Sequence, residues 1–586
     1  MFSRNRWFAL VLLLTLAVAA CGPAAEATPT PLPTQGATAP RATLSPTAAP
    51  VSPGTTAAPP TAKPTSAPPA VAKPKYGGTA IAYVRDWPLE WDFHKHIKSA
   101  RHFRAIHQSV FNSLGGKAAT GTKSCEWSTV PDLAESWAWT SDSIFEVKLA
   151  QGVKFQNKAP VNGREVTADD VIWSWNRILA ANPRVDPLKQ TLKDMQAVDR
   201  YTVRFQTKNP FPSIMSYLAI STTDNIVAKE SGDFSRDKTW GDWDTPEKSW
   251  IGTGPFVFEK AVTSVRVEMK RNPDYFKKGL PYLDSLVFLD VPDMSTRIAA
   301  MTSGKLDLWY AEVPPVTAAT VGKIAPQLQI QRCPTITPMV TFMRTDQAPF
   351  NDARVRRAAL MALDQDSYIK TAFLGEALRS TILPPLNPSY LKLDEFPPEL
   401  RRNMEYNPAE AKRLLAEAGY PNGFDTVFNA YSGYGSPYTE AMETMSQMLN
   451  AVGIRAKLTY LLRAVYDQQT VSGEWQGLRA AKAGDIENPY YHFLSYHSKT
   501  PVADNKSHVN DKELDALVEQ FVVETNAAKS GDLARRIQYR LADQVYQLVA
   551  PNNFDYSIAQ PWLKGYVKAG DEPTSRFWSQ VIWLDK

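Results

Sequence analysis

The sequence contains few of the residues that commonly build metal centres. Among 586 residues there are only three cysteines and seven histidines. Three cysteines exclude both a disulfide-rich scaffold and a zinc-ribbon pattern. His94, His96, His102 and His107 lie close together, but no cysteine or carboxylate completes a recognisable metal site beside them. We therefore expect neither a metal nor another cofactor.

The motifs of several common enzyme classes are also missing. The chain has no Gly-x-Ser-x-Gly nucleophile elbow, no Walker A sequence and no His-Glu-x-x-His. Gly252-Thr-Gly254 lacks the third glycine of a dinucleotide-binding loop and precedes Pro255, which suits a turn. Carboxylates are so abundant that no glycosidase pair can be singled out by inspection. These absences favour a protein without catalytic activity.

Strong charge of one sign and long apolar runs are scarce as well. The net charge of +5 is too small and too evenly spread to indicate a nucleic-acid partner. The longest apolar run, Trp7–Ala20, is shorter than the roughly 20 residues that a membrane span needs. Its length and its position after a short basic head are typical of a signal-peptide core.

The end of this apolar run predicts a lipid anchor. Val18-Ala-Ala-Cys21 places small residues before a cysteine and resembles a bacterial lipobox. The resemblance implies cleavage before Cys21, a diacylglycerol on its sulfur and acylation of its amino group, and two or more acyl chains anchor a protein stably. We expect residues 1–20 to be the signal peptide and the protein to be tethered to the outer face of the cytoplasmic membrane, on the periplasmic side or at the cell surface. A plain signal peptide with a chance cysteine is the alternative.

Residues 21–75 are predicted to be a lipid-anchored, disordered linker. After Cys21 they are almost all alanine, threonine and proline, and they hold many of the 45 prolines of the chain. Such a segment buries too little apolar surface to offset the entropy of ordering. Its prolines favour an extended, semi-rigid spacer.

From Tyr76 onward the patterns predict a globular α/β region with mixed sheets. Alternating apolar and polar residues indicate strands at 143–149, 201–205 and 265–269, and a further strand is predicted at 454–460. Capping residues predict helices that begin after Thr167, at Asn407-Pro408 and at Ser436. Amphipathic helices are expected at 514–523 and 533–549.

Several segments in register resemble family 5 of the bacterial extracellular solute-binding proteins, the dipeptide-, oligopeptide- and nickel-binding components of ABC importers. The matching segments are Pro131–Trp137, Phe145–Leu149, Gly152–Phe155, Thr167–Val171, Ser174-Trp175, Gly252–Phe256, Arg271–Phe276, Gly279–Asp284, Ser303–Asp307, Phe350–Arg356, Tyr406–Lys412 and Ala418–Pro421. The resemblance covers about Tyr76 to Lys586.

The resemblance implies an α/β fold of the periplasmic-binding-protein type II, with two lobes, a hinge and a subdomain inserted in the first lobe. By analogy, lobe I comprises residues 76–104, 236–333 and 552–586, the insertion 105–235, and lobe II 334–551. Ligand is expected between the lobes, which close around it by hinge bending.

The implied function is that of a substrate-binding lipoprotein of an ABC importer. It would capture a peptide, or else a nickel chelate, an oligosaccharide or another small solute, and deliver it to a permease with its ATPase subunits. We expect a monomer that binds no nucleic acid. Two alternatives stay open: a surface-anchored hydrolase, and an adhesin or sensor that keeps the binding fold.

The resemblance also suggests charged ligand contacts. In peptide-binding relatives an aspartate of lobe II pairs with the ligand's α-amino group, and Asp485 stands at its place; a loop aspartate that caps a turn is the alternative. Arg479 stands where some oligopeptide binders have an arginine suited to a carboxylate, and a solvated strand-end arginine is the alternative. Lys482 replaces a tryptophan common in relatives, which weakens the case for peptides and favours an acidic ligand.

Aromatic residues near these charges are candidates for the walls of the ligand site, although core packing is the ordinary role of each. They are Tyr431, Tyr434, Trp475, Tyr490 and Tyr491. Cys125 and Cys333 would lie in different subdomains on the family pattern, and whether they form a disulfide outside the cytoplasm stays open.

Overall fold

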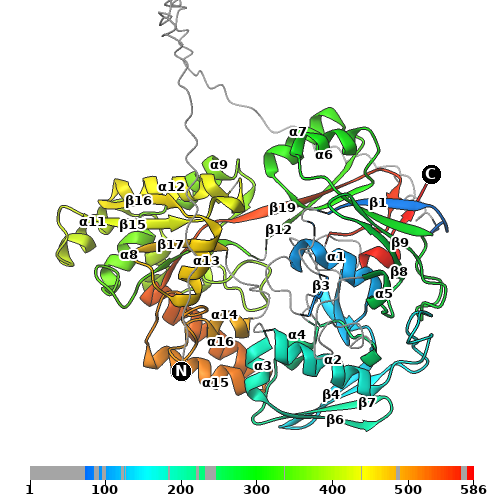
Figure 1. Ribbon diagram of the computed structural model, residues 1–586. Coiled ribbons are helices and arrows are strands. Elements are labelled where there is room, and N and C mark those ends of the chain that lie inside the picture. Colours follow the sequence, from blue (N-terminus) through cyan, green and yellow to red (C-terminus); the bar gives the residue numbers. More distant parts are fainter. Residues whose placement is uncertain are drawn as a thin grey trace, which may run out of the picture. The chain divides into compact units, whose positions relative to one another are not determined.

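The computed structural model describes residues 73–84, 87, 91–94, 100–119, 125, 127–182, 185–219, 224–230, 246–335, 337–436, 438–482, 489–568 and 577–586. The predicted signal peptide, Cys21, most of the predicted linker, and Asp485 lie outside the described residues. All described residues belong to one unit, Ala72–Lys586, in which strands alternate with helices (Figure 1). Among the described helices, none is long and apolar enough to cross a membrane.

The largest sheet has eight strands in the order β12-β19-β11-β1-β10-β9-β8, with β14 added beside β19. Strand β1 pairs in parallel with β10 and β11, and the remaining pairs are antiparallel. Its strands are β1 (Thr79–Val84), β8 (Phe256–Val262), β9 (Arg266–Arg271), β10 (Ser285–Asp290), β11 (Leu308–Val313), β12 (Gln329–Pro334), β14 (Ala377–Leu378) and β19 (Asn552–Ala559).

Both faces of this sheet are buried, which explains the nearly continuous apolar sequence of β1. Ala80 and Ala82 pack in a cluster with helix α1 (Ala100–Val110). Tyr83 points to the other face and packs in a cluster with α6 (Met294–Thr302) and α7 (Pro315–Ile324). Successive side chains of a strand point to opposite faces, so one strand contributes to two cores.

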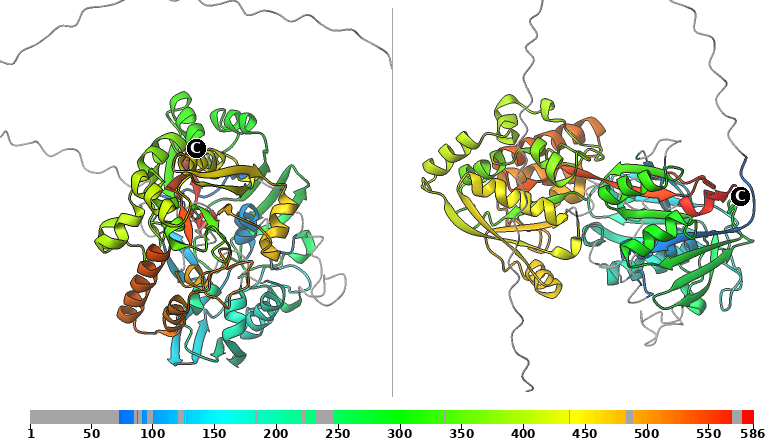
Figure 2. Two further views of the ribbon diagram at one scale, coloured as in Figure 1. Left: turned by 90° about the vertical axis from the view of Figure 1, so that its left-hand side faces the viewer. Right: turned by 90° about the horizontal axis from the view of Figure 1, so that it is seen from above.

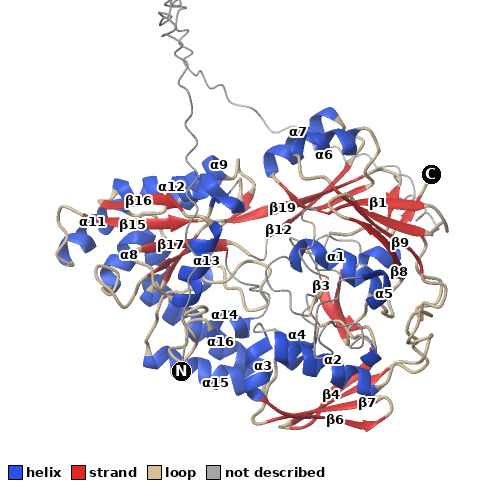
Figure 3. Ribbon diagram, viewed as in Figure 1, coloured by secondary structure: helices blue, strands red, loops and turns tan. Residues whose placement is uncertain are grey.

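A five-stranded sheet has the order β16-β15-β17-β13-β18. Strand β15 pairs in parallel with β16 and β17, whereas β13 is antiparallel to β17 and β18. Helices lie on both sides of the sheet (Figure 3). The strands are β13 (Met339–Met343), β15 (Phe424–Ala430), β16 (Ile454–Tyr460), β17 (Leu478–Lys482) and β18 (Gln547–Val549). The main helices are α8 (Ala353–Met361), α9 (Gln365–Ala372), α11 (Pro408–Glu417), α12 (Tyr438–Ala451), α13 (Arg463–Ser472), α14 (Pro489–Leu494), α15 (Lys512–Val523) and α16 (Ala527–Gln544).

A third, antiparallel sheet has the order β4-β5-β7-β6 and lies between α1 and α5 in the sequence. It comprises β4 (Ala134–Ser141), β5 (Ile144–Leu149), β6 (Leu192–Asp199) and β7 (Thr202–Thr207), with α2 (Ala168–Ala181), α3 (Asp186–Thr191) and α4 (Ile214–Leu218). A hairpin of β2 (Gly115–Ala119) and β3 (Trp127–Pro131) precedes it. Shorter elements are α5 (Pro246–Ser249), η3 (Leu393–Glu395), α10 (Pro398–Arg401), η4 (Arg402–Met404), η5 (Ser432–Tyr434), β20 (Leu563–Lys564), α17 (Trp578–Val581) and β21 (Trp583–Leu584).

Two chain segments connect the large sheet to the five-stranded sheet, and their paths can be followed by colour in Figures 1 and 2. One leads from β12 to β13 and the other from β18 to β19. The amide of Thr335 donates to the carbonyl of Asn553 at 2.8 Å, and that of Ala550 donates to Met339 at 3.1 Å. The two segments therefore run side by side.

Most of the elements predicted from sequence are confirmed. Strand β16 has the predicted bounds, and α11 begins after Asn407, whose side chain accepts the amide of Glu410 at 3.0 Å. The prediction of one helix from 533 to 549 was wrong at its end. Helix α16 stops at Gln544, Val545 has a positive φ of 50°, and residues 547–549 pair with β13 as β18. Residues 547–549 form a strand because they pair with β13 at the edge of the sheet. The helical periodicity of the sequence does not show whether a segment will find such a partner.

Candidate functional site

The carboxyl ends of three parallel strands lie at one edge of the five-stranded sheet. Strand β15 ends before Tyr431, β16 ends before Leu461, and β17 ends at Lys482. In α/β sheets, ligands commonly bind outside this end of the strands. The segment after β17 contains Asp485, which lies outside the described residues, so its predicted contact with an amine stays a prediction.

Arg479, the second residue of β17, is a buried cation. It is 1% exposed, and its Nη2 donates to the carbonyl of Tyr466 and to the hydroxyl of Thr470. Its guanidinium lies 4.1 Å from the ring centroid of Tyr466 and 5.9 Å from that of Trp475. Within the described part of the chain, Nε and Nη1 have no hydrogen-bond partner. The alternative of a solvated strand-end arginine is therefore wrong.

Unpaired donors on a buried guanidinium are costly, because the group has lost its water without gaining an anion. Among the described residues, no carboxylate lies within 4.0 Å of Arg479. A carboxylate from a bound molecule would fit this fork-shaped group in bidentate geometry. The arrangement is thus suited to binding an anion.

Lys482 and Arg479 are three residues apart on β17, so they point to opposite faces of the sheet. Lys482 lies over the rings of Tyr438, at 4.4 Å, and Tyr434, at 5.6 Å. Tyr431 contacts Tyr434, with ring centroids 5.2 Å apart. Tyr466 links this aromatic group to Arg479, because its ring centroid lies 5.8 Å from that of Tyr431 and 6.4 Å from that of Tyr434.

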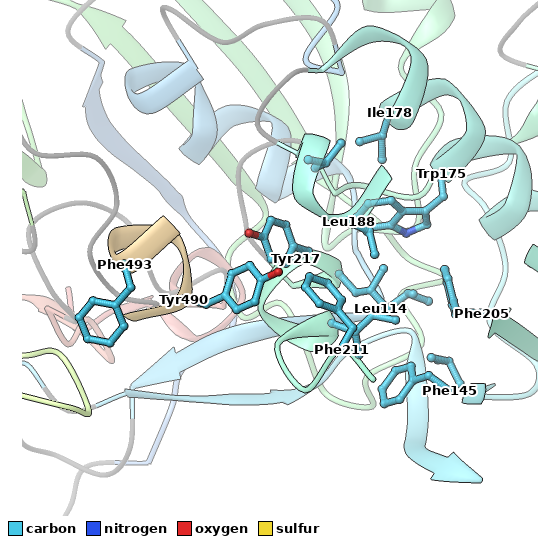
Figure 4. Close-up of a cluster of buried hydrophobic side chains, with 14 of the residues drawn as sticks. Leu114, Phe145, Trp175, Ile178, Leu188, Phe205, Phe211, Tyr217, Tyr490 and Phe493 are labelled. Carbon is cyan, nitrogen blue, oxygen red and sulfur yellow. The ribbon is translucent and has the colours of Figure 1, made fainter. Parts of the chain in front are cut away.

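Tyr490 of α14 meets two aromatic residues from the neighbourhood of α4. Its ring centroid lies 5.1 Å from Phe211 and 6.1 Å from Tyr217 (Figure 4). The hydroxyl of Tyr217 is buried and has no hydrogen-bond partner in the described part of the chain, and burial raises its pKa well above the usual value. Tyr491, the next residue on α14, donates to Asp504 at 3.1 Å. Tyr490 therefore joins the region that follows β17 to the four-stranded-sheet region.

Trp475 lies between two cations in the interior. It is 5% exposed, with the guanidinium of Arg344 5.6 Å from its ring centroid and that of Arg479 at 5.9 Å. Arg344 also donates to the carbonyl of Trp475. These contacts indicate that Trp475 packs against the guanidinium of Arg479 and helps to hold it in place.

Sequence reasoning missed Tyr466, Tyr217 and Lys506. Tyr466 of α13 stacks on Arg479 and donates from its hydroxyl to Ala480 at 2.8 Å. Lys506 lies in the loop before α15, and its ammonium is 5.5 Å from the ring centroid of Phe342. An aromatic residue on an amphipathic helix and a lysine in a loop carry no local signal that separates them from ordinary core and surface residues.

Two of the four clustered histidines, His94 and His107, form hydrogen bonds with Asn225. His94 Nε2 lies 2.9 Å from the carbonyl of Asn225, whose side-chain amide donates to His107 Nδ1 at 2.8 Å. Burial and then the charge of Arg177 hold the pKa of His94 well below its usual value. Within the described residues, no group of three potential ligands could hold a metal ion. His96 lies outside the described residues.

Cys125 and Cys333 form a disulfide, with Cα atoms 5.2 Å apart. Cys125 follows β2, and Cys333 lies in β12, one residue before its end. The bridge links the connection between β2 and β3 to β12, the strand that precedes the segment leading to β13. This settles the pairing that the sequence left open.

Comparisons with known proteins agree with this architecture. Residues 128–504 match the family described as "Bacterial extracellular solute-binding proteins, family 5 Middle". Heme-binding protein A of Haemophilus influenzae is 28% identical over 494 residues, which are 80% of this chain and 86% of that protein. Di/tripeptide-binding protein 2 of Pseudomonas aeruginosa is 28% identical over 472 residues, 77% of this chain and 84% of that protein. The oligopeptide-binding protein AppA of Bacillus subtilis, solved with a nonapeptide, shares the fold with a TM-score of 0.70 at 20% identity, over 88% of this chain and 100% of that chain.

Proposed function

Because this chain belongs to family 5 of the bacterial extracellular solute-binding proteins, we propose that it captures a small peptide and delivers it to the permease of an ABC importer. Its fold is the α/β, two-lobed type II fold of periplasmic binding proteins. Its family and its structural neighbours are binding proteins rather than enzymes. On this proposal the chain performs no chemistry, and ATPase subunits of the importer supply the energy for transport.

The observation that carries the proposal is the buried guanidinium of Arg479, whose Nε and Nη1 have no hydrogen-bond partner among the described residues. A peptide has a terminal carboxylate that fits these donors. Its terminal ammonium would pair with Asp485, by the resemblance to peptide-binding relatives. Two opposite charges at the two ends of a site would orient the peptide and favour one length.

Aromatic side chains would hold the body of the ligand. Tyr490 is the best placed, because it meets Phe211 and Tyr217 across two separate parts of the chain. Tyr431 and Tyr434 follow the carboxyl end of β15, and Lys482 is the last residue of β17, where contacts with a longer ligand are expected. Tyr491 and Trp475 would act by positioning Asp504 and Arg479 respectively.

The proposed lobe boundaries follow from the family pattern. Lobe I would comprise 76–104, 236–333 and 552–586, the insertion 105–235, and lobe II 334–551. The course of the two crossing segments supports this division, because 335–338 and 550–551 join the large sheet to the five-stranded sheet. Bending at these segments would open and close the site.

The family is extracellular or periplasmic, and we assign this chain to the outer face of the cytoplasmic membrane. Acylated Cys21 would anchor it there, and residues 22–75 would serve as a spacer between the membrane and the lobes. A monomer on such a spacer can reach both free solute and a neighbouring permease.

A ligand screen tests the proposal. The purified protein is mixed with Ala-Ala-Ala, its C-terminal amide, its N-acetyl form, a nickel chelate and an oligosaccharide, and unfolding is followed by thermal shift. A ligand at 100 times its dissociation constant stabilises the folded state by about 2.7 kcal/mol.

We expect the free tripeptide to stabilise the protein, with smaller shifts for the amide and the acetyl form. Arg479→Met should remove the difference between acid and amide, and Asp485→Asn the difference between free and acetylated amine. Stabilisation by the chelate or the oligosaccharide alone would contradict the peptide proposal.

A further inference from the structure

Lys506 is held on a rigid turn before α15. Asn505 fixes the turn from within, because its Oδ1 accepts the amide of Val509 at 2.9 Å and its Nδ2 donates to the Val509 carbonyl at 2.9 Å. The hydroxyl of Ser507 donates to the carbonyl of Tyr546 at 2.8 Å. The backbone on both sides of Lys506 is therefore anchored, and its side chain starts from a defined position.

The ammonium of Lys506 lies on the same face of the sheet as Arg479. Phe342 of β13 is paired directly with Arg479 of β17, so their side chains share one face. The Nζ atom of Lys506 lies 5.5 Å from the ring centroid of Phe342. Burial lowers the pKa of Lys506, the charge of Asp504 partly offsets this effect, and the charge of Arg479 lowers the pKa further. The two cations thus act on each other, with Arg479 buried and Lys506 half-buried.

The described carboxylates do not neutralise this pair of cations. Asp504 acts on Lys506 electrostatically, but its carboxylate accepts the hydroxyl of Tyr491 and lies beyond ion-pair distance of Nζ. Within the described residues, neither Arg479 nor Lys506 has a carboxylate within 4.0 Å. Two neighbouring, partly desolvated like charges are unfavourable, and an anion placed between them would relieve both.

We infer that Lys506 is a specificity-determining residue and that the ligand carries two carboxylates at one end, as a peptide with a C-terminal glutamate does. One carboxylate meets the free donors of Arg479 and the second meets the ammonium of Lys506. This inference rests on the proposed function, which places the terminal carboxylate of a peptide at Arg479. It adds that the final residue of the peptide is acidic. Asp504 and Tyr491 border the subsite.

The test compares Ala-Ala-Glu with Ala-Ala-Gln, and uses glutarate as a dicarboxylate that is not a peptide. Isothermal titration calorimetry measures their binding to the wild type, Lys506→Met, Lys506→Arg and Lys499→Met. Lys499 lies in the same part of the chain, pairs with Glu519 at 3.0 Å and is 79% exposed at its side chain, so its substitution is the matched control.

We expect the wild type and Lys499→Met to bind Ala-Ala-Glu at least about tenfold more tightly than Ala-Ala-Gln, the value of a charge-assisted hydrogen bond. Lys506→Met should reduce the preference to less than about threefold, and Lys506→Arg should keep it. Without ligand, Lys506→Met should melt at the wild-type temperature or above it, because it removes an unpaired, partly buried charge. A purely structural lysine would lower the melting temperature and leave the preference intact.

The remaining outcomes separate this inference from the proposed function. Equal binding of the two peptides by the wild type, or a preference that survives in Lys506→Met, overturns the subsite and leaves peptide capture standing. Binding of glutarate alone, lost in Lys506→Met, supports the subsite and overturns peptide capture. Failure of both peptides and glutarate to bind overturns both.

Discussion

The disulfide between Cys125 and Cys333 should be a major source of stability, and replacing both residues with serine removes it. The bridge joins residues that are 208 positions apart in the sequence. It closes a loop that contains all of the four-stranded sheet as well as β8 to β11 of the large sheet. The bridge therefore restricts a large part of the unfolded chain, and its removal should have a large effect on stability.

The expected magnitude follows from the length of the closed loop. In the chain-entropy relation, a bridge lowers the entropy of the unfolded chain in proportion to the logarithm of the loop length. For a separation of 208 residues, the relation predicts a stabilisation of about 5 kcal/mol at 25 °C. The native contacts around the bridge change little on substitution, because the amide of Cys125 still donates to the carbonyl of Lys568, at 2.9 Å. The loss should therefore lie at about 3–5 kcal/mol.

Urea denaturation, followed by tryptophan fluorescence, measures this loss. The wild type in dithiothreitol should unfold like the double serine variant in either buffer, while the oxidised wild type unfolds at higher urea. Thiol titration of the unfolded wild type should find two more thiols after reduction than before. An oxidised wild type and a double serine variant whose unfolding free energies agree within about 1 kcal/mol would refute the reasoning.

Three further changes test other parts of the structure. Asp132→Ala should cost about 3–5 kcal/mol in thermal denaturation, because the buried side-chain amide of Asn112 and the amide of Ser113 lose their acceptor and Lys277, now at 2.8 Å, loses its ion-pair partner; a loss below 1 kcal/mol would contradict this. Gly252→Ala should lower the melting temperature sharply, because the added Cβ would lie 2.0 Å from the carbonyl oxygen of Val110; an unchanged melting temperature would show that the turn has room. Asp511→Asn should destabilise the protein less at low pH than at pH 7: burial raises the pKa of Asp511, but hydrogen bonds, chiefly from Arg540 at 2.7 Å, outweigh burial and lower it. The stability contributed by this carboxylate is complete above its unfolded pKa of about 3.9 and is lost as the pH falls through the lower folded pKa, so urea unfolding of both proteins at pH 7 and pH 3 should show the gap closing.

Local elements and family membership were readable from the sequence. The bounds of β16 and the start of α11 depend on nearby residues: alternating apolar positions, an asparagine cap and a proline at the first helical position. The motifs in register from Pro131 to Pro421 indicated the family because each is short, local and in a fixed order along the chain.

The arrangement of the candidate site was only partly readable. Arg479 was found through its spacing from Asp485, but the sequence did not show that its guanidinium is buried or that Lys482 points to the other face of the sheet. Once β17 is known to be a strand, the odd spacing of the two residues explains their separation.

The contacts that give the site its character were decided by the tertiary structure. Tyr217 and Tyr490 meet although they lie far apart in the sequence, and Lys506 reaches the face of Arg479 only because β13 pairs with β17. The pairing of Cys125 with Cys333 and the sheet pairing of 547–549 have the same origin. Periodicity and capping report the environment of a residue within one element, whereas these contacts depend on which buried surfaces of distant elements pack together, and that is set by the free energy of the whole chain.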